Sequence, residues 1–148
     1  MSRIERIEEE RKDFIQYKKS ISCDGDPKQG DTVWNIIMEG PKDSPYMGGK
    51  FNIKITFPND YPTKPPVFEF LTPIIHINIS GKTICLGSLK DYDKYHSNLS
   101  ILELLSQIFM MLTSPNETSA YPEYYDLYFN HYAEYLDKAR EKTRECAM

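Results

Sequence analysis

The stretch that decides the fold runs from residue 50 to residue 57 and reads KFNIKITF. Apolar side chains occupy alternate positions with polar ones between them, which is the period of a β-strand with one buried and one wet side. We predict further strands at residues 32–39 and 67–71 and a short strand near Ile21. Because the connections are short and rich in Gly and Pro, these elements form a four-stranded antiparallel meander sheet.

Helices are expected before and after these strands. Residues 2–18 carry apolar side chains at near-helical spacing among charged ones, which predicts an amphipathic N-terminal helix. Ser100, with a glutamate three positions later, forms a capping-box pattern, so a central helix begins there and ends before Pro115. The aromatic and charged tail at 121–143 predicts two closing helices whose tyrosines pack in a core. This order indicates an α+β fold in a single domain spanning residues 1–148.

Composition excludes several classes of partner. A net charge of -4 and a pI near 5.4 provide no basic surface for a phosphate backbone, so nucleic acid is not expected. No run approaches the roughly 18 apolar residues of a membrane span, and the first residues lack the apolar core of a secretion signal. The 3 cysteines are too widely spaced for a disulfide framework or a zinc site. We therefore expect a cytoplasmic or nuclear protein with no membrane, metal or small cofactor.

The longest segment without helical or strand periodicity lies between residues 72 and 98 and contains Cys85. A loop of that length in a compact domain is usually functional. A thiolate is intrinsically nucleophilic, so a thiol in such a loop is a candidate reactive group. A lone thiol elsewhere is more often a packing residue, which is our interpretation of Cys23 and Cys146.

Ordered motifs along the chain resemble the signature of ubiquitin-conjugating enzymes. They are GPxDSxYxGGxF at 40–51, FPxDYPxKPP at 57–66, HxN at 76–78, GxxICL at 81–86 and LxxPN at 112–116. Such agreement in order is far more specific than any single short motif. The resemblance implies the UBC fold, with an active-site loop between the sheet and the central helix.

The resemblance also implies an activity and a set of site residues. The enzyme would accept ubiquitin from an activating enzyme as a thioester on Cys85 and transfer it to a lysine of a protein substrate or to a ligase. Asn78 would orient the loop and stabilise the oxyanion, a task that suits an amide because it donates without titrating. Supporting roles are implied for His76, Leu86 and Ser119. His76 would hydrogen-bond the loop, and Ser119 stands where many relatives carry Asp.

Several positions depart from the family pattern. Ile77 replaces the rigid proline of His-Pro-Asn, and Tyr95 replaces the usual Trp in a segment that is longer than in the common ubiquitin carriers. The positions that would dock the activating enzyme and ligases are Arg3, Arg6, Thr63, Ser97 and Asn98. This docking surface is also unusual, because Thr63 stands where relatives often carry Phe, Ser97 and Asn98 fall where relatives have Ser-Pro-Ala, and glutamates accompany the arginines of the first helix. We therefore infer altered partner choice.

Two alternatives to a ubiquitin carrier remain. The longer loop after Cys85 and the small residues near Thr63 also resemble the carrier of the modifier SUMO, although the insertion between the first two strands and the strongly basic helix of that carrier are absent. A catalytically weak UBC-fold binding module would accommodate the altered His-x-Asn, but such variants typically lack the cysteine. The sequence therefore favours a carrier of ubiquitin.

Overall fold

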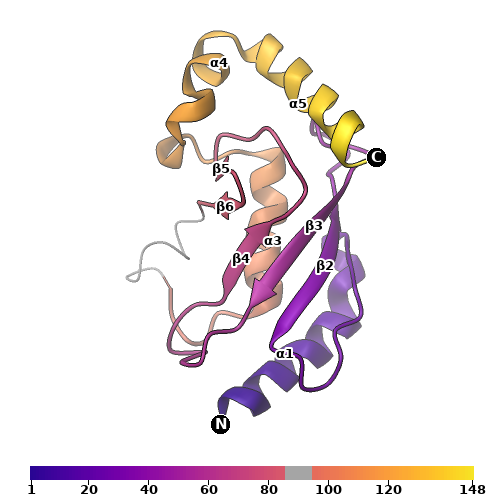
Figure 1. Ribbon diagram of the computed structural model, residues 1–148, viewed down its shortest axis with the longest axis vertical. Coiled ribbons are helices and arrows are strands. Elements are labelled where there is room, and N and C mark those ends of the chain that lie inside the picture. Colours follow the sequence, from indigo (N-terminus) through magenta and orange to yellow (C-terminus); the bar gives the residue numbers. More distant parts are fainter. Residues whose placement is uncertain (86–94) are drawn as a thin grey trace.

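The computed structural model describes residues 1–85 and 95–148, which form an antiparallel sheet with helices before and after it (Figure 1). The predicted helices and strands are present with small shifts at their ends. In chain order the elements are α1 (Arg3–Tyr17), a 3-10 turn (Lys18–Ile21), β1 (Cys23–Asp24), β2 (Val33–Glu39), β3 (Lys50–Thr56), β4 (Val67–Phe70), β5 (Ile79–Ser80), β6 (Thr83–Ile84), α3 (Ile101–Thr113), 3-10 turns at Glu117–Ser119 and Pro122–Tyr124, α4 (Tyr125–Asn130) and α5 (Tyr132–Cys146).

The sheet has the strand order β1-β2-β3-β4-β6-β5, and every neighbouring pair is antiparallel. The predicted four-strand meander is its first part, and the alternate residues of β3 are buried as the sequence pattern requires. The sheet also gains β6 and β5, for which we predicted only loop. Each of these strands has 2 residues, too few to show an alternating pattern in the sequence.

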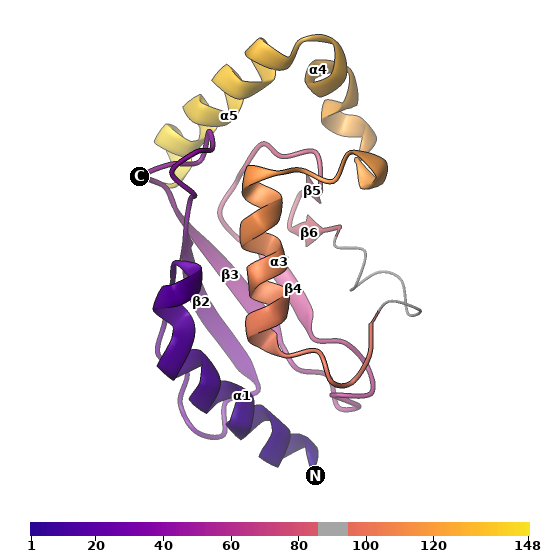
Figure 2. The ribbon, with the colours of Figure 1, turned by 180° about the vertical axis from the view of Figure 1, so that it is seen from behind.

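The core lies between the sheet and α3, which covers one of its faces (Figure 2). The N-cap of α3 is Ser100, whose hydroxyl accepts the backbone N–H of Glu103 at 3.0 Å, as the capping pattern predicted. The buried side of the helix carries Ile101, Leu104, Leu105, Ile108, Met111 and Leu112. In the part of the chain that the structure describes, no helix covers the opposite face of the sheet (Figure 1). The main meander is thus exposed to solvent on one side, which explains why apolar and polar residues alternate along its strands.

Helices α4 and α5 lie beyond the end of the sheet that carries the β5–β6 hairpin (Figure 1). A second apolar cluster forms there around Ile77, Tyr128 and Tyr135. The packing role predicted for the C-terminal tyrosines holds for those two, whereas Tyr125 and Tyr132 are about half exposed. Within the described residues no helix is both long and apolar enough to cross a membrane.

Candidate active site

The β5–β6 hairpin positions Cys85. Ile79 pairs with Ile84 across the hairpin, and both side chains are buried, which fixes the register. Gly81 in the turn has a φ of 59°, a left-handed conformation that glycine adopts without steric cost. One step beyond the paired strands, the Cys85 N–H donates to the carbonyl of Asn78 at 2.8 Å. Cys85 and Asn78 are therefore held directly opposite each other.

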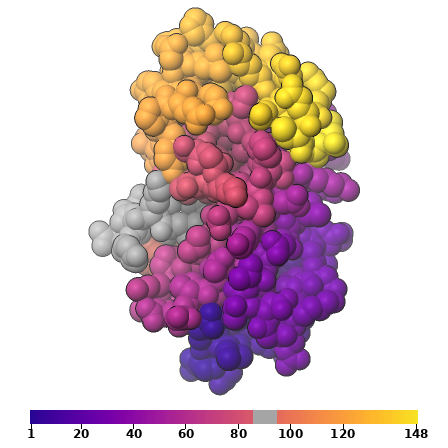
Figure 3. Space-filling view, viewed as in Figure 1, coloured from indigo at the N-terminus to yellow at the C-terminus, as the bar shows by residue number. Residues whose placement is uncertain are grey.

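The three thiols lie in different surroundings. Cys85 is partly exposed at the end of the hairpin, whose surface lies between those of the C-terminal helices and the β3–β4 region (Figure 3). Burial raises the pKa of the Cys23 thiol to about 12, so Cys23 stays protonated inside the core. Cys146 is exposed at the end of α5. Among residues 1–85 and 95–148, no group of three or more His, Cys, Asp or Glu side chains is arranged to hold a metal ion.

Asn78 fastens the hairpin to the loop that follows α3. Its Oδ1 accepts the Asn116 N–H at 2.9 Å, while its Nδ2 donates to the carbonyls of Asn116 at 2.8 Å and Ser119 at 3.2 Å. The side chain is fully buried, and both amide hydrogens are engaged. The oxyanion role expected for Asn78 would need one of these N–H groups to be released, and that role stays a prediction. The geometry accounts directly for the orienting role.

His76 is buried and hydrogen-bonded through both ring nitrogens. Its Nδ1 lies 3.0 Å from the backbone N–H of Asn78, which can only donate, so Nδ1 must be the unprotonated acceptor. Nε2 therefore carries the hydrogen and donates to the Met111 carbonyl at 2.8 Å. Burial lowers the pKa of His76 from 6.5 to about 4, although the bond to Met111 opposes this effect. The neutral ring therefore connects the segment before the hairpin to α3 through two hydrogen bonds.

This lowered pKa predicts acid sensitivity. Between pH 6.5 and 4 the unfolded chain protonates His76 while the folded chain does not, so the free energy of unfolding falls as pH falls through that range. The loss is about 1.4 kcal/mol per pH unit and about 3 kcal/mol in total. Urea unfolding at a series of pH values measures it, with His76→Gln as the control that cannot titrate. Equal pH dependence of the two proteins would contradict the prediction.

The loop after α3 carries Ser119, the residue expected in place of an acid. It closes a 3-10 turn that is capped by the Asn116 side chain, which accepts the Thr118 N–H at 3.1 Å. Hydrogen bonds of Asn78 therefore bring Cys85, Asn78 and Ser119 into one site. Leu86, also expected in support, lies outside the described residues. Sequence reasoning missed the capping role of Asn116, although this residue stands in the quoted LxxPN motif.

The five residues expected to dock partners differ in exposure and in whether their side chains already make contacts within the chain. The Arg3 guanidinium donates to the carbonyls of Phe57 and Pro58, both at 2.8 Å. Arg6 is ion-paired with the buried Glu10 at 3.0 Å, so neither arginine is an uncommitted surface charge. The remaining three, Thr63, Ser97 and Asn98, are exposed. The exposed members of the expected docking set are therefore polar and uncharged.

Internal contacts gather these docking residues at the end of the molecule that carries the N-terminus of α1. The Tyr95 hydroxyl donates to the Pro62 carbonyl at 2.6 Å and so joins the residues just before α3 to the proline-dense loop. Arg6 lies over the ring of Tyr61 at 5.8 Å and donates to the Leu99 carbonyl at 3.2 Å. These contacts hold the first helix, the proline-dense loop and residues 95–99 together.

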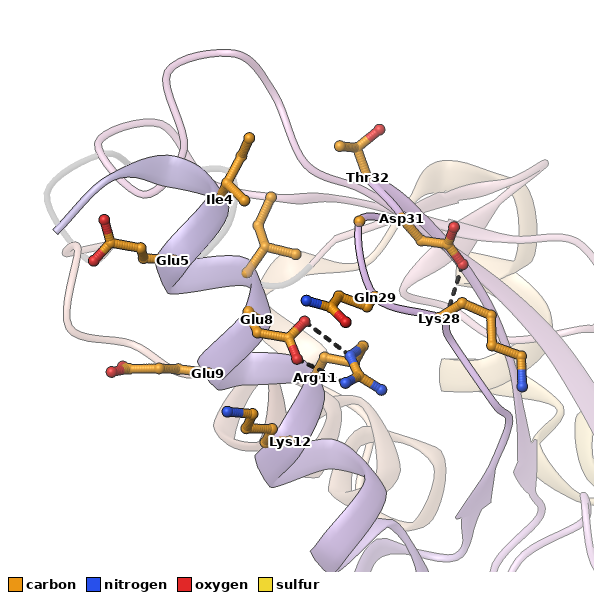
Figure 4. A pocket seen from close by; sticks show the side chains of 12 residues that line it. Ile4, Glu5, Glu8, Glu9, Arg11, Lys12, Lys28, Gln29, Asp31 and Thr32 are labelled. Atoms are coloured by element: carbon orange, nitrogen blue, oxygen red, sulfur yellow. Dashed lines mark hydrogen bonds and ion pairs between the residues drawn. The ribbon is translucent and has the colours of Figure 1, made fainter.

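A cavity of about 500 Å³ lies at the same end, between α1 and the loop before β2 (Figure 4). Its lining is of mixed charge, and three of its charged groups are already engaged. Glu8 is paired with Arg11 at 2.6 Å, and the Asp31 carboxylate accepts the Lys28 backbone N–H at 2.9 Å. The elements that line it, α1 and the loop before β2, lie away from the β5–β6 hairpin in the ribbon views (Figures 1 and 2). It is therefore no part of the Cys85 site.

Comparison with known proteins identifies the family of this chain. Residues 6–143 match the sequence model of the family described as "Ubiquitin-conjugating enzyme". The chain belongs to the ubiquitin-conjugating enzyme family. It is 38% identical over 128 residues to an Arabidopsis thaliana protein named "Probable ubiquitin-conjugating enzyme E2 31", a match that covers 85% of this chain and 82% of that protein.

Solved structures confirm the fold. A ubiquitin conjugating enzyme domain from Toxoplasma gondii superposes with a TM-score of 0.84 at 31% identity, covering 97% of both chains. A Plasmodium yoelii protein classed as a ubiquitin conjugating enzyme gives a TM-score of 0.88 at 31% identity, covering 100% of this chain and 97% of that one. The UBC fold and the transferase family predicted from the sequence are thus both confirmed for this ubiquitin-conjugating enzyme.

Proposed function

We propose that this ubiquitin-conjugating enzyme carries ubiquitin as a thioester on Cys85. The observation that supports the proposal is the register of the β5–β6 hairpin. It places Cys85, whose thiol is partly exposed, opposite Asn78, and the Cys85 N–H donates to the Asn78 carbonyl at 2.8 Å. Among the three cysteines, Cys23 is buried as a protonated thiol and Cys146 lies in the last turn of α5. Of the three thiols, only that of Cys85 is both accessible to solvent and placed next to the backbone that Asn78 and His76 hold by hydrogen bonds.

The proposed reaction has two balanced steps. In the first, the Cys85 thiol loses its proton, and its sulfur attacks the carbonyl of a thioester on the activating enzyme, whose cysteine leaves as a thiolate and takes up a proton. In the second, a neutral amine or a ligase thiolate attacks the carbonyl of the Cys85 thioester and forms an amide or a new thioester, while the Cys85 sulfur leaves with the electron pair of its bond. When the attacking group is an amine, its nitrogen also loses one proton, which the departing thiolate or water takes up. The peptide groups held by Asn78 keep the thioester in one orientation during this attack.

The same chemistry indicates the partners. We expect an activating enzyme, ligases and protein substrates with accessible lysines, in the cytoplasm or the nucleus, where thiols stay reduced. The polar, largely uncharged docking residues Thr63, Ser97 and Asn98 support a partner set that differs from that of relatives with basic or aromatic docking sites. Docking through Arg3 or Arg6 would require them to leave their present acceptors.

A charging assay tests the proposal. The protein is mixed with an activating enzyme, ATP and a panel of modifiers that includes ubiquitin and SUMO, and the products are separated on gels with and without reductant. We expect an adduct with ubiquitin that reductant removes. An adduct with SUMO alone would show that the carried modifier is SUMO and not ubiquitin. If no modifier formed an adduct, the carrier function would be overturned in favour of a binding module.

Because residue 119 is a serine, we predict that the site gives the incoming amine little help in losing its proton. An unperturbed lysine has a pKa of about 10.4, so it must lose a proton before it attacks. A serine at this place cannot offset the ammonium charge as a carboxylate does. Ser119→Asp should therefore speed discharge to free lysine about threefold near neutral pH. Single-turnover discharge of the purified thioester measures this rate.

Ser119→Ala is the matched control for this prediction. The bond from Asn78 reaches the main-chain carbonyl of Ser119, so removal of the hydroxyl leaves the site braced. We expect its discharge rate to stay at the wild-type value. If Ser119→Asp were no faster than the wild type or Ser119→Ala, assistance at this position would be refuted.

A further inference from the structure

Ile77 introduces a buried hydrogen-bond donor into the active-site segment. The family pattern has proline here, which has no backbone N–H, whereas isoleucine has one. Ile77 has 0% of its surface exposed, so water does not satisfy that group. A buried N–H without a partner is costly, and folded proteins almost always supply one. The replacement of proline by isoleucine therefore creates a requirement that another part of the chain must meet.

The hydroxyl of Tyr135 meets this requirement. Its oxygen accepts the Ile77 N–H at 3.1 Å, across 58 positions of sequence. Tyr135 projects from α5, is 1% exposed, and has its ring packed edge-on against Tyr128 at a centroid distance of 5.0 Å. This packing leaves the phenol little freedom to move. The acceptor is thus a fixed point on the C-terminal helix.

The carbonyls of Ile77 and of the nearby Ile75 are also held by hydrogen bonds. The Ile77 carbonyl accepts the Tyr121 N–H at 2.8 Å, and the carbonyl of Ile75, two residues earlier, accepts the Tyr46 hydroxyl at 2.6 Å. Asn78 follows Ile77 directly, and its carbonyl holds the Cys85 N–H. A displacement at Ile77 would therefore pass directly to Asn78, the residue whose carbonyl holds Cys85.

We propose that Tyr135 is a positioning residue for Cys85. Its hydroxyl binds the Ile77 N–H and so fixes, from α5, the backbone that proline fixes through its ring in the common family pattern. The consequence for discharge rests on the proposed thioester function of Cys85, whereas the coupling between Tyr135 and Ile77 does not. Tyr135 acts through Ile77 and Asn78 and does not touch the reacting atoms.

A double-mutant cycle tests the proposal with Tyr135→Phe, Ile77→Pro and the combined variant. Tyr135→Phe leaves the Ile77 N–H without its acceptor, so we expect the maximal rate of discharge to lysine to fall about tenfold while the lysine concentration at half-maximal rate is unchanged. In the Ile77→Pro background no N–H is present, so removal of the hydroxyl breaks only its contact with the Tyr46 hydroxyl and should change the rate less than about twofold. Charging by the activating enzyme should persist in all variants.

Tyr128→Phe is the matched control, because its hydroxyl donates to Glu117 at 2.9 Å and not to the active-site segment. Its effect should be the same in both backgrounds. Amide hydrogen exchange supplies a readout that needs no thioester: the Ile77 N–H should exchange about tenfold faster in Tyr135→Phe than in the wild type. Equal effects of Tyr135→Phe in the wild-type and Ile77→Pro backgrounds, or unchanged Ile77 exchange, would overturn the proposal even if charging is normal.

Discussion

Replacement of Cys85 by alanine is expected to abolish the ubiquitin adduct completely. We expect no other thiol to take its place, because Cys23 is 2% exposed with a pKa of about 12, and Cys146, although exposed, lies at the end of α5 outside the site that Asn78 holds. Cys85→Ser should instead form an adduct that resists reductant, since an oxygen ester is not cleaved by thiols. Gels run with and without reductant distinguish the two products.

Cys146→Ser provides the control for this experiment. The residue is exposed and belongs to no part of the braced site, so charging should stay at the wild-type level. An adduct that survived in Cys85→Ala and vanished in Cys146→Ser would transfer the carrier role to the C-terminal thiol. Loss of the adduct in both variants would show that folding, and not the nucleophile, had been affected.

Asn78→Ala should give the second large effect. Truncation removes three hydrogen bonds at a fully buried side chain and leaves the Asn116 N–H and two carbonyls without their partner. We expect the free energy of unfolding to fall by about 3 kcal/mol. Discharge to lysine should slow at least about tenfold, because the loop around Cys85 loses its attachment, while charging continues. Urea unfolding and single-turnover discharge measure the two quantities.

The pair of measurements also separates the two roles of Asn78. If the amide acts mainly by bracing the loop, discharge and stability fall together. If it is mainly an oxyanion donor, discharge falls while the free energy of unfolding stays near that of the wild type. Asn35→Ala on the exposed side of β2 is the control and should alter neither quantity. Unchanged discharge in Asn78→Ala would remove the residue from both roles.

Much of this enzyme could be predicted from local pattern. Alternating residues in KFNIKITF identified the central strand, and Ser100 identified the start of α3, because pleat and helix caps act over a few neighbouring residues. The β5–β6 hairpin could not be predicted in this way. Its strands of 2 residues are held by pairing with β4 and by burial of Ile79 and Ile84, which are long-range effects.

The sequence by itself determined the family, the meander, the helices and the choice of Cys85 as candidate nucleophile, since each depends on residue type and spacing along the chain. Only the tertiary structure decided how the site is held. The bonds from Asn78 to the loop after α3, from His76 to Met111 and from Tyr135 to Ile77 each join residues at least 35 positions apart. Packing of the helices against the sheet brings such partners together, and no local pattern records which buried donor meets which acceptor.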